Sequence, residues 1–192
     1  ETNYLKTKKK NNNTINVMYT GNIGYAQDFG GLIKDLNNCY FVNFIFVGNG
    51  RYMPELKKLV KKFRLQNRVK FKPFQKLENL PKTVESADFL YLSLKNEEIF
   101  KKTIPAKLQT YMCLKKPIIA MISGEANEII NKSKCGMAVN SGDYAGLEKL
   151  FNKSINLTQK DLDLMSRKSF NFYKSNFSFK FRIEQIEHLF NF

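Results

Sequence analysis

Three lysines surround the start of one predicted helix, in the stretch FKKTIPAKLQTYM (residues 100–112). Pro105 suits a first helical turn, because its fixed φ is helical and the N–H that it lacks would have no partner there. Lys101, Lys102 and Lys107 crowd that end, where the helix dipole is already positive and favours anions. Free backbone N–H groups and ammonium groups can together bind a phosphate. The local sequence supports two interpretations equally: an anion site, or lysines that point into water.

Two glycine-containing turns are further candidates for contact with a phosphate. GNIG (residues 21–24) and GNG (48–50) each follow a predicted strand. Glycine lets backbone N–H groups approach a ligand closely, but neither turn has the full GxGxxG spacing. The missing spacing favours an ordinary structural turn for both, and more so for the second. Gly124 and Glu125 open another predicted helix, where an acidic first turn is also common capping.

The sequence has no Ser-His-Asp set, no metal-binding cluster and no close pair of carboxylates with a catalytic logic. His188 is the single histidine, and its place on the last predicted helix favours a surface position. We therefore identify no catalytic residue from the sequence, and we predict no metal and no cofactor. If the domain is part of an enzyme, it is the half that holds the substrate.

Composition limits the classes of protein that fit. The 192 residues carry a formal charge of +15, which suggests an acidic partner such as a nucleotide, a nucleic acid or an anionic membrane. A general bias toward lysine would produce the same charge. Cys39, Cys113 and Cys135 lie far apart without CxxC spacing, which argues against disulfides or zinc and fits a reducing cytoplasm. Because no apolar run approaches the ~18 residues of a membrane span, we expect a soluble cytoplasmic protein.

Strand-like and helix-like segments alternate along the chain. Residues 1–13 include the polar run TKKKNNN and are predicted to be a linker arm, and residues 14–192 form one domain. Short apolar runs predict strands at 15–19, 40–47, 69–71, 88–94, 117–122 and 136–139. Apolar residues at helical spacing predict helices at 28–37, 53–63, 77–87, from 105, at 125–133, 142–151, 158–174 and 179–190. This order predicts an α/β fold, a doubly wound parallel sheet, with a ligand site beyond the carboxyl ends of its strands.

Taken in order, these segments resemble the C-terminal, donor-binding domain of bacterial retaining glycosyltransferases of the GT-B fold. That fold pairs two Rossmann-like domains, and the match is closest to the family 4-like branch that builds surface polysaccharides. The resemblance rests on YTGNIGYAQ (19–27), the block at 44–74, SADFLYLSL (86–94), TIPAKLQTYMCLKKPIIA (103–120), the segment 124–143 and NFSFKFRIEQIEHLF (176–190).

The resemblance implies that a nucleotide-diphosphate sugar, commonly a uridine one, lies across the strand ends. The glycine turn, with Gly21, Asn22 and Gly24, would face the diphosphate. So would the helix that begins at Pro105 and Ala106, to which Lys107 adds a positive charge. Phe74 and Gln75 would flank the base, and Gly124 and Glu125 would lie near the sugar or a phosphate.

This sequence departs from the family pattern at four positions. Asn22 and Gln27 replace an arginine and a lysine that many relatives carry in the first turn. Lys102 and Thr110 stand where the broader family has two glutamates, so the residues that hold the ribose and assist catalysis are not identified. The resemblance further implies an N-terminal domain of the same protein and a lipid-linked or saccharide acceptor. The positive charge of the chain in addition suggests a peripheral place on the inner face of the cytoplasmic membrane.

Two alternatives remain at this point. The same paired-domain fold would serve half of a nucleotide-sugar epimerase, although no matching acid–base set is visible. The charge alone would suit a nucleic-acid-binding module, but the lysines are spread over the whole chain without the interleaved aromatic residues of RNA-binding domains. We therefore expect no nucleic-acid partner.

Overall fold

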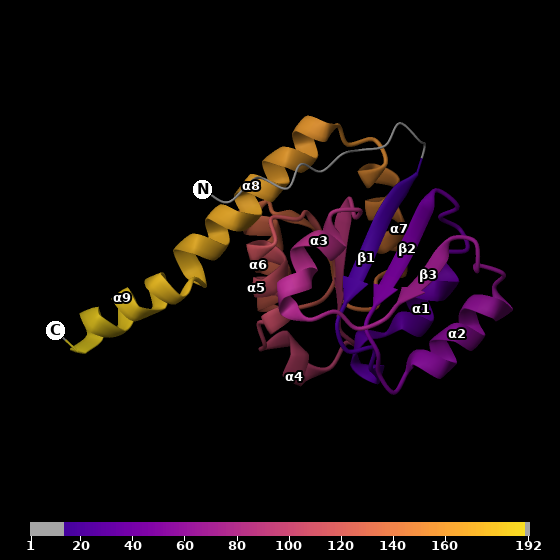
Figure 1. Ribbon diagram of the computed structural model, residues 1–192, viewed down its shortest axis with the longest axis horizontal. Coiled ribbons are helices and arrows are strands. Elements are labelled where there is room, and N and C mark those ends of the chain that lie inside the picture. Colours follow the sequence, from indigo (N-terminus) through magenta and orange to yellow (C-terminus); the bar gives the residue numbers. More distant parts are fainter. Residues whose placement is uncertain (1–13, 191–192) are drawn as a thin grey trace.

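Six parallel strands form the centre of the molecule, in the order β3-β2-β1-β4-β5-β6 (Figure 1). The structure is a computed structural model that describes residues 14–190, so the predicted arm at 1–13 lies outside the described residues. The strands are β1 (Ile15–Thr20), β2 (Val42–Val47), β3 (Val69–Lys72), β4 (Phe89–Ser93), β5 (Ile118–Met121) and β6 (Gly136–Val139). Every paired neighbour runs parallel, which confirms the predicted doubly wound α/β fold.

Helices connect the strands and cover both faces of the sheet (Figure 1). They are η1 (Tyr25–Gln27), α1 (Phe29–Asp35), α2 (Met53–Lys62), η2 (Leu77–Asn79), α3 (Leu80–Val84), α4 (Glu98–Lys101), α5 (Ala106–Cys113), α6 (Glu125–Ser133), α7 (Tyr144–Ser154), α8 (Gln159–Asn176) and α9 (Phe179–Phe190). The N-caps of the later helices fit their sequences. Asp143 accepts a hydrogen bond from the Gly146 N–H at 2.8 Å, and Thr158 and Asp161 form a capping box.

Alternation along the strands divides the core into two layers. On β1, Ile15, Val17 and Tyr19 point to the side covered by α1, α2 and α7, whereas Met18 points to the side of α3, α5 and α6. Since both faces are covered, the central strands β4 and β5 are buried along their whole length, whereas the edge strand β3 (VKFK) alternates between apolar and charged residues. Figure 1 shows α8 running along this second layer and α9 projecting beyond the sheet, where His188 is exposed as predicted.

The strand order reverses between β1 and β4, because β1 continues toward β2 on one side and β4 leads to β5 on the other. Loops that leave the two strands therefore diverge and open a crevice at the carboxyl edge of the sheet. Two details differ from the prediction there. The expected loop at 95–104 contains the single turn α4, which is too short to show a periodic pattern. Pro105 is the N-cap of α5, with an extended ψ of 135°, rather than its first helical residue.

Candidate functional site

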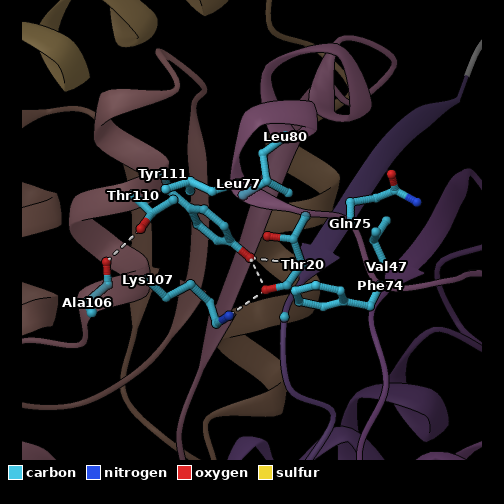
Figure 2. A pocket seen from close by; sticks show the side chains of 11 residues that line it. Thr20, Val47, Phe74, Gln75, Leu77, Leu80, Ala106, Lys107, Thr110 and Tyr111 are labelled. Carbon is cyan, nitrogen blue, oxygen red and sulfur yellow. Dashed lines mark hydrogen bonds between the residues drawn. The ribbon is translucent and has the colours of Figure 1, made fainter.

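A cavity of about 210 Å³ opens in the crevice where the strand order reverses (Figure 2). Its walls come from the end of β1, the end of β2, the segment from β3 to α3, and α5. The lining residues are Thr20, Gly21, Val47, Phe74, Gln75, Leu77, Leu80, Ala106, Lys107, Thr110 and Tyr111. Six of the predicted site residues are among them, although they are spread over 90 positions of the sequence: Gly21, Phe74, Gln75, Ala106, Lys107 and Thr110.

Two side chains of α5 bind the last residue of β1 (Figure 2). The Lys107 ammonium donates a hydrogen bond to the Thr20 carbonyl oxygen. The Tyr111 hydroxyl accepts a hydrogen bond from the Thr20 N–H at 3.0 Å. Lys107 and Tyr111 are four residues apart and so share one face of the helix. This pairing fixes the start of α5, with its free backbone N–H groups, against the wall of the cavity.

Lys107 is a half-buried cation without an anionic partner. Its ammonium nitrogen lies 4.6 Å from the centre of the Tyr19 ring, a favourable cation–π arrangement. Within residues 14–190 no carboxylate lies at ion-pair distance from it. Burial lowers the pKa of Lys107 from 10.5 to about 8. The site therefore holds a positive charge that a bound anion would stabilise.

The first glycine turn borders the cavity and the second supports it. Gly21 has a φ of +121°, and a Cβ there would lie 2.3 Å from the Lys107 ammonium. Gly48 has a φ of +144°, and a Cβ there would lie 1.9 Å from the Gly21 carbonyl oxygen. The two turns are also joined by the hydrogen bond from the Gly21 N–H to the Val47 carbonyl, at 2.8 Å. Gly48 thus acts through the conformation of the first turn, which agrees with its structural interpretation.

The rest of the first turn lies outside the cavity lining. Gln27 folds back, and its side-chain oxygen accepts a hydrogen bond from the Gly24 N–H at 3.0 Å. Its carbonyl accepts another from the Ser93 hydroxyl at 2.5 Å, which ties η1 to the end of β4. Asn22 is exposed. Gly24 and Gln27 therefore stabilise the turn, and only Gly21 of this segment lines the cavity.

Of the three lysines near the start of α5, two lie outside the cavity lining. Lys101 lies on α4 and pairs with Glu98, and Lys102 is exposed at the end of α4. Neither lines the cavity. Lys107 alone of the three reaches it.

Gly124 and Glu125 are also not in the lining. Gly124 has a φ of +76°, and a Cβ there would lie 2.0 Å from the Lys101 carbonyl oxygen, so the two loops are in close contact. Glu125 is the exposed first residue of α6. Pro105 precedes the lining residues as the N-cap of α5. Thr110 lines the cavity, while its hydroxyl donates to the Ala106 carbonyl at 3.1 Å.

Sequence reasoning missed two residues that build this site, Thr20 and Tyr111, and one buried lysine at the opposite edge of the sheet. Thr20 and Tyr111 lie in segments that the sequence identifies only as strand and helix, and the spacing of Tyr111 from Lys107 is the one available signal. Lys116 has no exposed surface, and its ammonium donates to the carbonyls of Glu85 at 3.2 Å and Ala87 at 2.7 Å. Burial lowers the pKa of Lys116 to about 8. It joins the loop before β4 to the loop before β5.

The lining divides into an apolar wall and a cationic end. Val47, Phe74, Leu77 and Leu80 offer an apolar surface that suits a flat ring, and Phe74 keeps 65% of its surface exposed. The first turn of α5 offers amides and an ammonium group.

Within the described range, no group of three potential metal ligands occurs. No helix built from residues 14–190 is long and apolar enough to cross a membrane.

Known structures share this fold over nearly the whole chain. HepE of Anabaena, solved in complex with UDP and glucose, is 21% identical and superposes with a TM-score of 0.76 over 93% of this chain and 48% of its own. A variant of TarM from S. aureus, solved with UDP, fondaparinux and α-GlcNAc-glycerol, is 16% identical with a TM-score of 0.76, over 97% of this chain and 37% of its own. This chain thus spans about half the length of HepE.

One similar structure has nearly the same extent as this chain. The C-terminal domain of the glycosyl transferase group 1 protein LpcC from Francisella tularensis is 17% identical, with a TM-score of 0.66 over 86% of this chain and 87% of its own. No curated protein sequence matches this chain.

The family comparison covers most of the described domain. The family described as glycosyl transferases group 1 matches residues 15–157, from the start of β1 to the loop after α7. That range contains every residue of the cavity lining. The chain therefore belongs to the group 1 glycosyl transferases, and its sheet and helices form one Rossmann-like domain of their GT-B fold.

Proposed function

We propose that the cavity binds the nucleotide diphosphate of a donor sugar, which a UDP-sugar would supply. The supporting observation is the position of Lys107, a cation without an anionic partner at the mouth of a cavity whose other wall is apolar. A uracil ring would lie against Phe74 and Gln75. The diphosphate would lie against the backbone of Gly21 and Asn22 and against the free N–H groups in the first turn of α5.

The sugar would then extend toward the contact between the two loops at Lys101 and Gly124. This places it near Gly124 and Glu125 but outside the cavity itself. In glycosyl transfer the departing diphosphate gains negative charge, and fixed cations and amides stabilise that charge in the transition state. This domain would hold the donor and stabilise the leaving group. The acceptor and the remaining catalytic groups would come from an N-terminal domain of the same protein.

The finer assignment follows from the resemblance in sequence. We propose a retaining, family 4-like enzyme of surface polysaccharide synthesis, which uses a lipid-linked or saccharide acceptor. It would need neither a metal nor a cofactor, because Lys107 and the helix amides neutralise the diphosphate. The similar structures support UDP as the nucleotide, since HepE and TarM were both solved with it.

Titration calorimetry of this chain with UDP and with UDP-sugars tests the proposal. We expect saturable binding of UDP and competition between UDP and a UDP-sugar. Lys102→Ala provides a matched control, because Lys102 is an exposed lysine outside the cavity and its loss should leave the affinity unchanged. Absence of UDP binding by a chain whose circular dichroism shows an intact fold would contradict the proposal.

We also propose that the protein works in the cytoplasm, at the inner face of the membrane. One side of α2 exposes Lys57, Lys58, Lys61 and Lys62, and each lysine near an anionic bilayer contributes roughly 1 kcal/mol. Co-sedimentation with vesicles should increase with the fraction of anionic lipid. Replacing these four lysines with glutamine should abolish the increase, and equal sedimentation with neutral vesicles would refute the membrane role.

A further inference from the structure

A second hollow lies on the opposite side of the sheet, between α1 and α7. It measures about 470 Å³, and no residue that lines it also lines the nucleotide cavity. Its lining residues are Asp28, Gly31, Lys34, Asp35, Asn38 and Tyr144. The proposed donor site does not use any of them.

Asp35 is the unusual residue of this hollow. It lies on the inner side of α1 with only 8% of its surface exposed. Its Oδ2 atom is buried and has no hydrogen-bond partner in the described structure. Buried carboxylates normally have a donor or a cation beside them, because a buried charge without one is costly. Asp35 lines the hollow, and one of its carboxyl oxygens has no donor within residues 14–190, which indicates a missing partner for this carboxyl group.

The surroundings of Asp35 are acidic, although the chain as a whole is strongly basic. The Asp28 carboxylate accepts a hydrogen bond from the Tyr144 hydroxyl. Burial, with the charge of Glu148 on α7 as a smaller cause, raises the pKa of Asp35 to about 6. Lys34 is exposed, and none of the ion pairs within residues 14–190 involves it. The hollow therefore brings together the carboxyl groups of Asp28 and Asp35, with that of Glu148 nearby.

The missing partner should be a cation that carries N–H donors. The described residues offer no group of three acidic, histidine or cysteine ligands for a metal ion. A protonated primary amine needs fewer fixed ligands, since its three N–H groups can be shared among separate acceptors. Asp35, Asp28 and the Asn38 amide supply such acceptors. We propose that this hollow binds a small ligand with a protonated amino group, which the Asp35 carboxylate holds.

The probe is ethanolammonium. Its binding to the whole chain is measured by saturation-transfer NMR and by calorimetry at constant ionic strength. We expect saturable binding at neutral pH that Asp35→Asn weakens about tenfold or more, because a charge-assisted hydrogen bond is lost. Asp163→Asn, a change at an exposed aspartate of α8, serves as the matched control and should bind as the original chain does. No saturable binding by the original chain would show a hollow filled with water only and would overturn the proposal.

Two further ligands test whether the N–H donors of the amino group are needed for binding. Choline has the same charge and hydroxyl group but no N–H donor on its nitrogen, and K⁺ has the charge alone. We expect both to bind more weakly than ethanolammonium. Equal binding of either would overturn the assignment of an amino group, and equal binding by Asp35→Asn would overturn the role of Asp35.

A pH titration of the unaltered chain supplies a readout that needs no variant. Because Asp35 takes up a proton near pH 6, ethanolammonium affinity should fall as the pH drops from about 7 to about 5. Affinity that stays constant over this range would contradict the proposal. The titratable groups that face Asp35 from the neighbouring elements are Asp28, Lys34, Cys39, Tyr91, Tyr144 and Glu148.

Discussion

Binding of UDP should draw a proton onto Lys107, and replacing this lysine with methionine should abolish the uptake. The pKa of Lys107 is about 8 without ligand, because burial disfavours the charged ammonium. About half of the molecules therefore carry a neutral Lys107 at pH 8, and roughly nine-tenths do at pH 9. Methionine has a similar length and no charge. The variant Lys107→Met therefore removes the titration while it largely keeps the shape of the side chain.

The size of the effect follows from Coulomb's law. A phosphate charge about 4 Å from the ammonium contributes about 4 kcal/mol at an effective dielectric constant of about 20. This raises the pKa of Lys107 by about 3 units and returns it to at least its ordinary value. Uptake should thus amount to about half a proton at pH 8, about 0.9 proton at pH 9 and very little at pH 7.

Calorimetry in buffers of different ionisation enthalpy measures this uptake directly. The dissociation constant of UDP should rise by up to about tenfold per pH unit above pH 8. The adjacent Tyr19 and Tyr111 do not contribute, because burial raises both phenol pKa values, that of Tyr111 to about 12. Lys107→Met should bind UDP up to about 1,000-fold more weakly at pH 7, which is the affinity equivalent of about 4 kcal/mol, and with no proton uptake. Tight binding at pH 9 without uptake, or equal uptake by the variant, would refute the reasoning.

The same substitution should stabilise the unliganded protein. A lysine whose pKa is lower in the folded state opposes folding below that pKa, and the penalty disappears as the pH rises from about 8 to 10.5. Lys107→Met should therefore raise the free energy of unfolding by up to about 3 kcal/mol at pH 7 and by much less at pH 10. Denaturant unfolding at the two pH values measures the difference. Lys102→Met, on an exposed residue, should show none of it.

Three other variants test the construction of the cavity. Phe74→Ala should weaken UDP binding by about 1 kcal/mol with little change in melting temperature, because the ring is 65% exposed, and an unchanged affinity would exclude contact with the base. Gly48→Ala should destabilise the fold by more than about 2 kcal/mol in thermal unfolding. Its control Gly142→Ala has a positive φ of +82° but an open surrounding and should lose only about 1 kcal/mol, so equal losses would contradict the role of the Gly21 contact. Tyr111→Phe should cost about 1–3 kcal/mol of unfolding free energy, because it removes the hydrogen-bond acceptor of the buried Thr20 N–H, and an unchanged melting temperature would contradict this.

The fold could be predicted from the sequence because its signals are local. Each strand is a short apolar run, and each longer helix carries an apolar stripe such as Leu56 and Val60 on α2. The alternation of the two element types then limits the topology to a few arrangements. The single turn α4 was missed because four residues cannot show a period of 3.6. The sequence places Lys101, Lys102 and Lys107 near the start of α5, but it does not indicate which of them lines the cavity.

The site could be predicted only as a set of loops. Strand order brings Gly21, Phe74 and Lys107 to one cavity, and the rule for switch points anticipates this from the topology. The direction in which a side chain points cannot be predicted from topology, because it depends on contacts between distant segments. Gln27 turns back onto its own turn, and Lys116 is buried although it has the sequence context of a surface lysine. These two side-chain positions depend on tertiary contacts, and no local sequence pattern predicts them.

Helix α8 has a practical consequence for anyone who shortens this protein. The stretch matched by the family ends at residue 157, but α8 follows it and packs against α5, the helix that carries Lys107. Ser169 of α8 also donates a hydrogen bond to the Lys116 carbonyl, at 3.4 Å. A truncation after residue 157 would expose an apolar surface of α5 to solvent and promote aggregation. The smallest fragment worth expressing therefore reaches at least Asn176.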